Sequence, residues 1–253
     1  MKKALFLLYF VCIASLISCA QNYAFRAGEH IEYSVGYSVI GIFLPAGSAS
    51  FTTIKTDTAN VFHFVGEGAT NKRYDWIFKV RDRYESYYDA KKMIPLKSVR
   101  TVSEGKYKKY EETIFDHKNN TATTKKGAFK IPADIQDVIS VVYQSRNLNF
   151  SNYKAGDKIA FNLFLGSEIY NMYIKYIGKE TVKTKYGNIK TIKLMPLLLK
   201  GNVFKGGEDM TVWITDDNNH LPVKIESQLS VGSIKVNLSS YQNLQYPPAF
   251  TKD

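Results

Sequence analysis

Apolar and polar residues alternate along most of the chain, which is the pattern of half-buried β-strands. Residues 31–39 place an apolar side chain at every second position, and the same alternation recurs at 74–80, 170–176, 210–214 and 223–238. Turn-forming residues separate these runs: Glu104-Gly105, Asn119-Asn120, Tyr186-Gly187-Asn188, Asp216 to Asn219 and Val231-Gly232-Ser233. Because such short runs pair most simply through hairpins, the pattern predicts about a dozen antiparallel strands.

One segment has the period of a helix instead. Apolar residues there fall at i, i+3, i+4 and i+7, at Ile135, Val138, Ile139 and Val142. Pro132 stands just upstream, and Asp134 is placed to cap the first turn. The spacing predicts one short amphipathic helix over about residues 134–146. Its apolar stripe would pack against a sheet face or plug an open end.

The predicted fold is all-β: curved antiparallel sheet forming a half-open barrel or a sandwich, with that single helix. Residues 21–250 are predicted to form one β-rich domain, because no Pro-, Gly- or Ser-rich linker divides them. A weak internal repeat, with the pattern Ala-Gly-acid-base-Ile-x-aromatic, begins at Ala27 and again at Ala155. It suggests two related halves, 25–132 and 155–245, although a tight turn feeding a strand gives the same pattern.

The first residues have the features of a bacterial secretory signal. Lys2 and Lys3 precede an apolar run, Ala4 to Ile17, that is shorter than the roughly 20 residues of a membrane-spanning helix. We expect residues 1–20 to be removed on export. Two cleavage sites fit: a lipobox, Leu16-Ile17-Ser18-Cys19, that would leave Cys19 lipidated, and an ordinary signal-peptidase site at Ser18-Cys19-Ala20.

Export limits the chemistry open to the two cysteines and the partners open to a basic chain. Cys12 leaves with the signal and Cys19 is lipidated or lost, so the mature chain is predicted to lack disulfides, thiolate nucleophiles and sulfur ligands. The formal net charge of +11 falls to +9 when Lys2 and Lys3 are removed. An exported basic chain meets anionic lipid headgroups and acidic glycans rather than nucleic acid, yet scattered lysines also serve solubility alone.

Several short motifs together resemble an uncharacterised bacterial family, the domain of unknown function DUF3108. They are Phe25 to Glu29 followed by Tyr33, Ala46-Gly47, Asp137 to Ser140 with Tyr143 and Arg146, Val212 to Asp217, and Leu221-Pro222-Val223. The resemblance covers nearly the whole mature chain. It implies a β-rich protein exported to the periplasm or outer membrane of a Gram-negative bacterium of the Bacteroidetes kind, and it brings no catalytic residues.

Motifs for enzyme chemistry are weak throughout. No Gly-x-Ser-x-Gly occurs, and the two Ser-x-x-Lys matches, at 103–106 and 151–154, fall on a turn and a loop. The four histidines are isolated from one another, so no metal or other cofactor is predicted. The spacing of the carboxylates selects no catalytic pair, and we interpret Asp137 with Arg146 as a structural ion pair. The chain is therefore expected not to be an enzyme.

Aromatic residues are the most suggestive candidates for binding, with 18 tyrosines and 15 phenylalanines against two tryptophans. Those on predicted strands with one inward face would either fill the core or line a pocket for an apolar or sugar ligand. The candidate ligand-binding residues are Tyr33, Tyr37, Trp76, Phe78, Tyr84, Tyr170 and Tyr173.

Four functional hypotheses remain open at this point. The leading one is a non-enzymatic exported protein that holds a lipid-like amphiphile or a glycan against a concave sheet. The second is a structural or assembly partner of an outer-membrane protein, and the third is a hydrolase of envelope polymers. The fourth, a transmembrane β-barrel, is disfavoured by the internal helix and by the prolines at 95, 132, 196 and 222.

Overall fold

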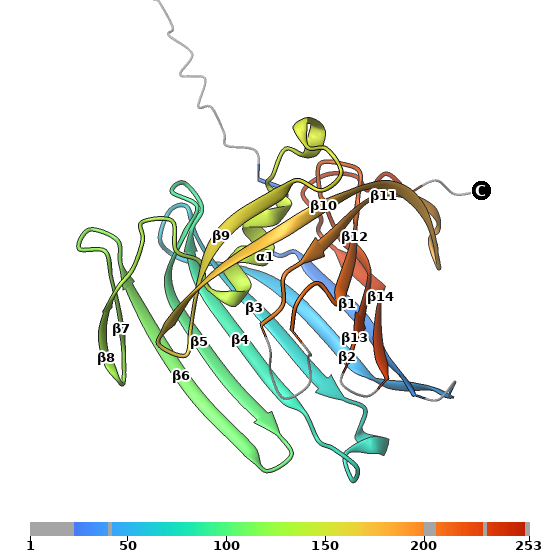
Figure 1. The fold of residues 1–253 in the computed structure, drawn as a ribbon, viewed down its shortest axis with the longest axis horizontal. Coiled ribbons are helices and arrows are strands. Elements are labelled where there is room, and N and C mark those ends of the chain that lie inside the picture. The colour runs from blue at the N-terminus through green and yellow to red at the C-terminus, as the bar shows by residue number, and fades with distance from the viewer. Residues whose placement is uncertain (1–22, 40–41, 200–205, 230–231, 251–253) are drawn as a thin grey trace, which may run out of the picture.

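The computed structural model describes residues 23–39, 42–199, 206–229 and 232–250 (Figure 1). The predicted signal peptide and Cys19 lie outside these residues. Fourteen strands form one antiparallel sheet, accompanied by the helix α1 (Val138–Arg146) and two short 3-10 helices, η1 (Lys72–Tyr74) and η2 (Phe150–Asn152). The first eight strands are β1 (His30–Val39), β2 (Ile42–Lys55), β3 (Val61–Thr70), β4 (Arg81–Asp89), β5 (Ile94–Glu104), β6 (Tyr107–Asp116), β7 (Thr121–Thr124) and β8 (Gly127–Lys130). The other six are β9 (Lys158–Leu165), β10 (Glu168–Thr184), β11 (Gly187–Pro196), β12 (Met210–Thr215), β13 (Pro222–Gln228) and β14 (Ser233–Gln242).

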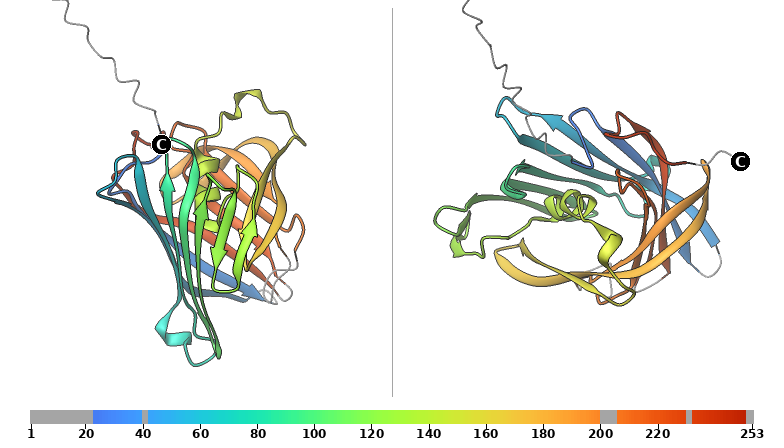
Figure 2. Two further views of the ribbon diagram at one scale, coloured as in Figure 1. Left: turned by 90° about the vertical axis from the view of Figure 1, so that its left-hand side faces the viewer. Right: turned by 90° about the horizontal axis from the view of Figure 1, so that it is seen from above.

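The sheet runs in the order β8-β7-β6-β5-β4-β3-β2-β1-β14-β13-β12-β11-β10-β9, so the first and last strands pair in its middle. Tyr33 of β1, for example, lies opposite Ala49 of β2 and Leu238 of β14. Seen from above, the sheet curls around α1 and leaves β8 and β9 as unjoined edges (Figure 2). The predicted all-β, half-open fold with one helix is confirmed.

The segment between β8 and α1 bridges the gap between the two edges of the sheet. The N–H of Gln136 donates to the carbonyl of Asn162 in β9 at 2.8 Å, and the Gln136 carbonyl accepts from the N–H of Phe164 at 2.8 Å. A buried apolar cluster lies at the same place: Phe115, Ala122, Ile131, Ile135 and Phe164. We use the term seam for the gap between β6–β8 and β9. These hydrogen bonds and apolar side chains fill this part of the seam.

The helix begins at Val138, four residues later than the predicted start at 134. Its cap is Asp137, whose Oδ1 accepts the N–H groups of Ile139 and Ser140 at 2.8 Å each, while Asp134 binds the side-chain amide of Asn162. The bridge to β9 explains the difference, because it holds residues before Asp137 in an extended path. The apolar periodicity could not show this constraint.

The buried face of α1 is only partly apolar. Its buried residues are Ile139, Ser140, Tyr143 and Arg146, so two of the four predicted apolar-stripe positions, Val138 and Val142, are only half-buried. The Tyr143 ring stacks on Phe64 of β3 with 3.6 Å between ring centroids. Gly66 allows this approach, because a Cβ there would lie 2.8 Å from Cδ1 of Ile139.

A buried ion pair anchors the end of the helix. Arg146 donates from Nη1 to Glu29 Oε1 at 2.6 Å and from Nη2 to Glu29 Oε2 at 2.9 Å. The same guanidinium donates to the carbonyls of Ala24 and Asn219, at 2.7 and 3.0 Å. The interpretation of Asp137 as the partner of Arg146 is therefore wrong; Asp137 accepts instead from the hydroxyl of Ser86 at 2.6 Å.

The two repeated sequences adopt the same local structure. Gly28 and Gly156 both have positive φ, 84° and 97°. The N–H of Gly28 donates to Thr53 of β2 at 2.8 Å, and that of Gly156 to Tyr176 of β10 at 2.9 Å. Each turn thus starts a strand, β1 or β9, by bonding to the neighbouring strand of the hairpin that follows.

Replacing Arg146 tests the buried pair. We expect Arg146→Met to lower the free energy of unfolding by about 3–5 kcal/mol, because Glu29 is left charged and buried without its partner. The double variant Glu29→Met with Arg146→Met should recover a substantial part of that loss in urea denaturation. Equal destabilisation of the single and double variants would show that the carbonyl contacts matter more than the pair.

Burial raises the pKa of Asp137 to about 6, although hydrogen bonds from Ser86, Ser140 and Ile139 act in the opposite direction. The folded state then holds a proton that the unfolded chain releases near 3.8, so this group makes stability fall as pH rises from about 4 through 6. We expect Asp137→Asn to remove that dependence in urea titrations at pH 5 and 7, measured as the difference from the wild type. Asp137→Ala, which removes the titrating group and the cap together, should be about 1–2 kcal/mol less stable than Asp137→Asn at both pH values.

Candidate functional site

The concave face of the sheet is buried beside α1 and partly exposed further from it. In β1, Ile31 and Tyr33 are buried, whereas Val35 and Tyr37 on the same face are half-buried. Burial decreases in the same direction along β14, β13, β12 and β4. The buried and then half-buried residues are, in that order, Leu238 then Val236 and Ile234; Val223 then Ile225; Ile214 then Val212 and Met210; and Ser86 then Tyr84 and Asp82. The helix therefore closes one end of the concave face and leaves the other end accessible.

The accessible end has an apolar wall on its β1 and β10–β14 side. Strand register aligns Val35 with Val236, Ile225, Val212, Leu194 and Tyr176 in one continuous row. We use the term apolar wall for the half-buried members of this surface, Val35, Tyr37, Val212, Ile225, Ile234 and Val236. Half-buried aliphatic side chains facing inward leave apolar area that a ligand can cover.

The opposite side, formed by β4–β6, is charged. Register places Tyr84, Arg100 and Glu111 in the row of Gly66, which contacts α1 and is therefore on the concave face. The Arg100 guanidinium forms an ion pair with Glu111, and Lys109 Nζ lies 2.7 Å from Glu111. We call this surface the charged strip; it consists of Asp82, Arg100, Glu104, Lys109 and Glu111.

Glu104 of the strip, and Tyr84, which lies opposite Arg100, have altered proton affinity. Burial raises the pKa of Glu104, and the neighbouring Asp82 carboxylate raises it further. Burial also raises the pKa of Tyr84, and the Arg100 guanidinium lies over its ring at 6.0 Å. The strip and Tyr84 thus combine a carboxyl group that protonates readily with cations and a phenol, which suits a polar headgroup better than an alkyl chain.

A hollow of about 760 Å³ adjoins the strip at the open part of the seam. Here β6 continues past the end of β7, which pairs only with Thr113–Asp116, and the β9–β10 turn faces it. The Thr124 and Ser167 hydroxyls lie 3.3 Å apart across the seam. The lining includes Lys109, Glu111, Lys125, Lys126 and Ser167. A volume of several hundred Å³ is typical of small-molecule sites.

Four of the seven candidate aromatic residues lie on the concave face: Tyr33, Tyr37, Tyr84 and Tyr170. Tyr33 is buried beside α1 and donates to the Pro222 carbonyl at 3.1 Å, so it belongs to the core. Tyr170, on the same side of β10 as Met172, donates to Glu168 at 2.6 Å and lies near Arg100 of the strip. The other two, Tyr37 and Tyr84, are half-buried towards the accessible end.

The other three candidates lie elsewhere. Tyr173 points to the convex side, where it donates to Glu208 at 2.7 Å and carries Lys158 over its ring at 4.2 Å. Trp76 and Phe78 are not on a strand; residues 72–79 form η1 and turns, and both side chains are exposed. The strand prediction for 74–80 is wrong, because Asp75 bonds with Thr70 and Arg81 and closes a loop.

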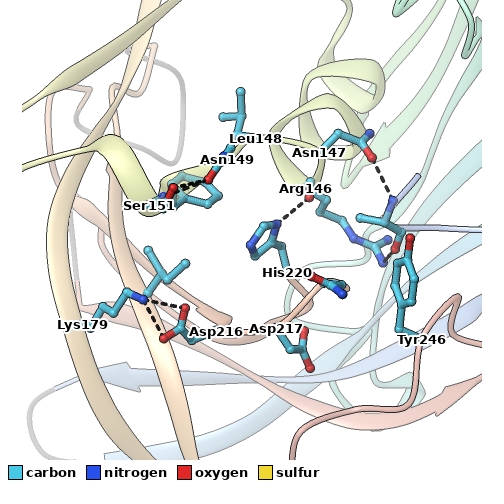
Figure 3. A pocket seen from close by; sticks show the side chains of 14 residues that line it. Arg146, Asn147, Leu148, Asn149, Ser151, Lys179, Asp216, Asp217, His220 and Tyr246 are labelled. Carbon is cyan, nitrogen blue, oxygen red and sulfur yellow. Dashed lines mark hydrogen bonds and ion pairs between the residues drawn. The ribbon is translucent and has the colours of Figure 1, made fainter. Parts of the chain in front are cut away.

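A second, polar hollow of about 500 Å³ lies at the other end, where α1 stops (Figure 3). Arg146, Asn149 and Ser151 border it on one side, and Asp216 to His220, from the turn between β12 and β13, border it on the other. His220 Nδ1 lies 2.6 Å from the Arg146 carbonyl, which can only accept, so Nδ1 carries the proton and Nε2 is the free acceptor. Burial lowers the pKa of His220.

This hollow does not assemble a nucleophile with a base. The Ser151 hydroxyl donates to Asn149 at 2.7 Å, Asp216 is held by Lys179 at 2.8 Å, and Asp217 accepts from Thr215 at 2.6 Å. Within the described residues, no hydrogen bond connects His220 to a serine or a carboxylate. The carboxylates there hold the turn together.

Within the described part of the chain, no group of three or more His, Cys, Asp or Glu side chains is arranged to hold a metal ion.

Among the same residues, no helix has the length and apolar character needed to cross a membrane.

Comparison with known families decides the relationship. The family described as "Protein of unknown function (DUF3108)" matches residues 32–239. The chain belongs to the DUF3108 family. No curated protein matches this DUF3108 chain.

A solved structure with a TM-score above 0.5 shares its fold at low sequence identity. A β-barrel-like protein of the domain of unknown function DUF1849 from Brucella abortus superposes with a TM-score of 0.57 at 9% identity, covering 85% of this chain and 97% of that one. Weaker likenesses include a Bacteroides fragilis protein named as exported with a YmcC-like fold, with a TM-score of 0.36 and 10% identity over 88% and 100% of the two chains. A Parabacteroides distasonis protein named as a lipoprotein gives 0.35 and 11% over 87% and 99%.

Most residues that carry the family resemblance meet around α1, although Gly47 and Val212 lie in the row of Val35 towards the accessible end. Glu29 and Arg146 form the buried pair, Asp137 caps the helix, and Tyr143 packs on the sheet. Gly47 has a similar structural reason, because a Cβ there would lie 2.2 Å from the Ala69 carbonyl oxygen. These motifs therefore specify the scaffold. The apolar wall and the charged strip lie largely outside them, and only period-two alternation hinted at their shared face.

The polar hollow yields a test by NMR. We expect the His220 imidazole to titrate below the ordinary value of 6.5, because burial disfavours its charged form, and to be protonated on Nδ1 at neutral pH. Nitrogen-resolved titration of the folded protein, with the urea-unfolded chain as reference, measures both. A His220 pKa at or above that of the unfolded chain would show that the attraction of the Asp216 and Asp217 carboxylates outweighs the effect of burial.

Proposed function

We propose that this protein is a non-enzymatic exported envelope protein that holds a lipid-like amphiphile at the accessible end of its concave sheet. The observation that carries the proposal is the pairing of a half-buried apolar wall with a charged strip on one concave face. An amphiphile needs both surfaces within one molecular length. Export rests on the signal-like residues 1–20.

The apolar wall supplies the driving force for a hydrocarbon chain. Its aliphatic members line successive strands in register, so an extended chain would follow them in one row from β1 to β12, with the polar Ser227 in the next row. Transfer of alkyl chain from water contributes roughly 0.8 kcal/mol per methylene. A chain of ordinary length would thus be bound without any specific polar contact.

The headgroup of the amphiphile would bind at the charged strip and the seam hollow. The seam lysines 125 and 126 offer cations, Arg100 and Lys109 add two more that share Glu111, and Glu104 offers a carboxyl group whose pKa is raised by burial. Such groups recognise phosphate or carboxylate oxygens. The amphiphile is therefore expected to carry a polar, anionic or zwitterionic head.

A glycan fits this surface less well than a lipid. Sugar rings would need broad aromatic faces beside one another, but Trp76, Phe78 and Tyr173 lie away from the concave face and Tyr33 is buried. The remaining wall is largely aliphatic. This composition favours an acyl chain.

Two neighbouring residues of β14 provide a matched test. Val236 belongs to the apolar wall, and Asn237 beside it is exposed on the convex face. We expect Val236→Lys to weaken uptake of a fluorescent fatty acid about tenfold or more, because it places a charge in the chain-binding surface. Asn237→Lys should leave uptake unchanged.

Native mass spectrometry of protein purified from its own envelope should also show a bound amphiphile. Ligand-free protein there, together with equal uptake by the two lysine variants, would refute the proposal. Bound oligosaccharide in place of lipid would assign the concave face to glycans.

A further inference from the structure

The loop between β3 and β4 exposes three consecutive large apolar side chains. The exposed fractions are 83% for Trp76, 59% for Ile77 and 50% for Phe78. Most large apolar side chains of a folded protein do not occur in such a run at the surface, and contiguous exposure marks an interaction site. We call residues 76–78 the apolar tip.

The apolar tip is held in a defined shape. Arg81 forms a two-point contact with Asp75, Nη2 to Oδ2 at 2.7 Å and Nη1 to Oδ1 at 3.1 Å, and Asp75 also accepts from the Thr70 hydroxyl at 2.9 Å. The N–H groups of Ile77 and Phe78 donate to the Tyr74 carbonyl at 2.9 and 3.2 Å. The three apolar side chains are thus presented by a structured turn.

Cations surround the apolar tip. Lys72, Arg73 and Lys79 are exposed within the loop, and the adjacent β5–β6 turn adds the exposed Lys106. That turn lies against the loop, since the N–H of Gly105 donates to the Lys79 carbonyl at 2.7 Å. None of these four cations forms an ion pair with a described residue, so their charge is available to an anionic partner.

The apolar tip also has a particular place in the fold. It projects beyond the ends of β4 and β5, at the end of the sheet away from α1 (Figures 1 and 2). This is the end where the concave face is accessible. Whatever the tip binds is brought next to the apolar wall and the charged strip.

We propose that the apolar tip inserts into the headgroup region of a lipid membrane with anionic lipids, while Lys72, Arg73, Lys79 and Lys106 bind the lipid phosphates. Tryptophan prefers this interface because its ring is amphipathic, and Ile77 and Phe78 gain from partial burial among acyl chains. Each cation near an anionic surface adds to the affinity. Neither contribution needs a change in the fold.

A membrane fits the tip better than a protein partner does. Three side chains on a projecting turn offer far less than the roughly 800 Å² per partner of a stable protein interface. A ring of cations around an apolar point matches a lipid surface, where anionic headgroups lie above an apolar interior. The inference extends the proposed amphiphile binding, because a docked tip would place the concave face at the source of its ligand.

Vesicle binding of the full mature chain tests the proposal. We expect co-sedimentation with vesicles of phosphatidylethanolamine and phosphatidylglycerol, and weaker binding to pure phosphatidylcholine. The triple variant Trp76→Ser, Ile77→Ser, Phe78→Ser should lower the affinity about 100-fold. The control Ile54→Ser removes an exposed apolar side chain from the convex face and should bind as the wild type does.

The cations have a separate readout. Lys72→Gln, Arg73→Gln, Lys79→Gln should lower affinity for the anionic vesicles about tenfold or more and reduce its dependence on salt, because fewer phosphates are bound. Binding to phosphatidylcholine should change little. Equal salt dependence in wild type and variant would contradict the role of these residues.

Tryptophan fluorescence locates the inserted residue. The chain has two tryptophans, and Trp213 is buried, so a Trp213→Phe background reports Trp76 alone. Its emission should shift to the blue and become protected from acrylamide on adding anionic vesicles. An unshifted emission, or wild-type binding by the triple variant, would overturn the proposal, as would cross-linking of the tip to a protein in cells without vesicle binding.

The outcomes separate the two proposals. Loss of vesicle binding in the triple variant with a lipid still bound in native mass spectrometry supports both. Vesicle binding by a protein that never carries a lipid supports the membrane tip and refutes the amphiphile carrier. A protein that carries a bound lipid but does not bind vesicles supports the amphiphile carrier and refutes the membrane tip.

Discussion

The buried pair of Glu29 and Arg146 is the constraint on which the rest of the structure depends. It joins three segments that are distant in sequence: the N-terminal residues 24–29, the end of α1, and the β12–β13 turn at Asn219. A charge buried this deeply is tolerable only when it is well paired, and each guanidinium nitrogen of Arg146 donates to a carboxylate oxygen of Glu29 or to a backbone carbonyl. Moving α1 away from the sheet would leave Glu29 and Arg146 buried without their partners. The ion pair therefore holds the helix where it closes one end of the concave face.

That closure divides the concave surface into two regions with different roles. Beside α1, aromatic packing around Phe64 and Tyr143 fills the interior, and the absence of a side chain at Gly66 lets the helix approach. Beyond the helix the apolar wall and the charged strip are half-buried rather than enclosed, and Val212 of the wall packs against the cluster that includes Phe150 of η2. The proposed ligand and the proposed membrane contact both depend on this one-sided closure.

The sequence predicts the architecture well because period-two alternation reflects one buried face per strand, and it indicates the helix because Ile139 belongs to its buried face. It misplaces the helix start, and the apolar period includes only Ile139 of the four buried residues, since Ser140 is buried in the capping box with Asp137 and the partners of Arg146 lie far away in sequence. It assigns Trp76 and Phe78 to a strand because alternation alone cannot detect the contact of Asp75 with Arg81. The charged strip is equally hidden, because residues such as Arg100 and Glu111 become neighbours only through strand pairing.

The pairing of β1 with β14 has a consequence for how the chain folds. The middle of the sheet joins His30 to Gln242, so the contact that completes it waits for almost the last residues to be made. Hairpins on either side can form early from local contacts, but long-range pairing carries a large loop-closure cost and is slow. Strand β1 therefore lacks one of its two neighbouring strands until β14 has been made.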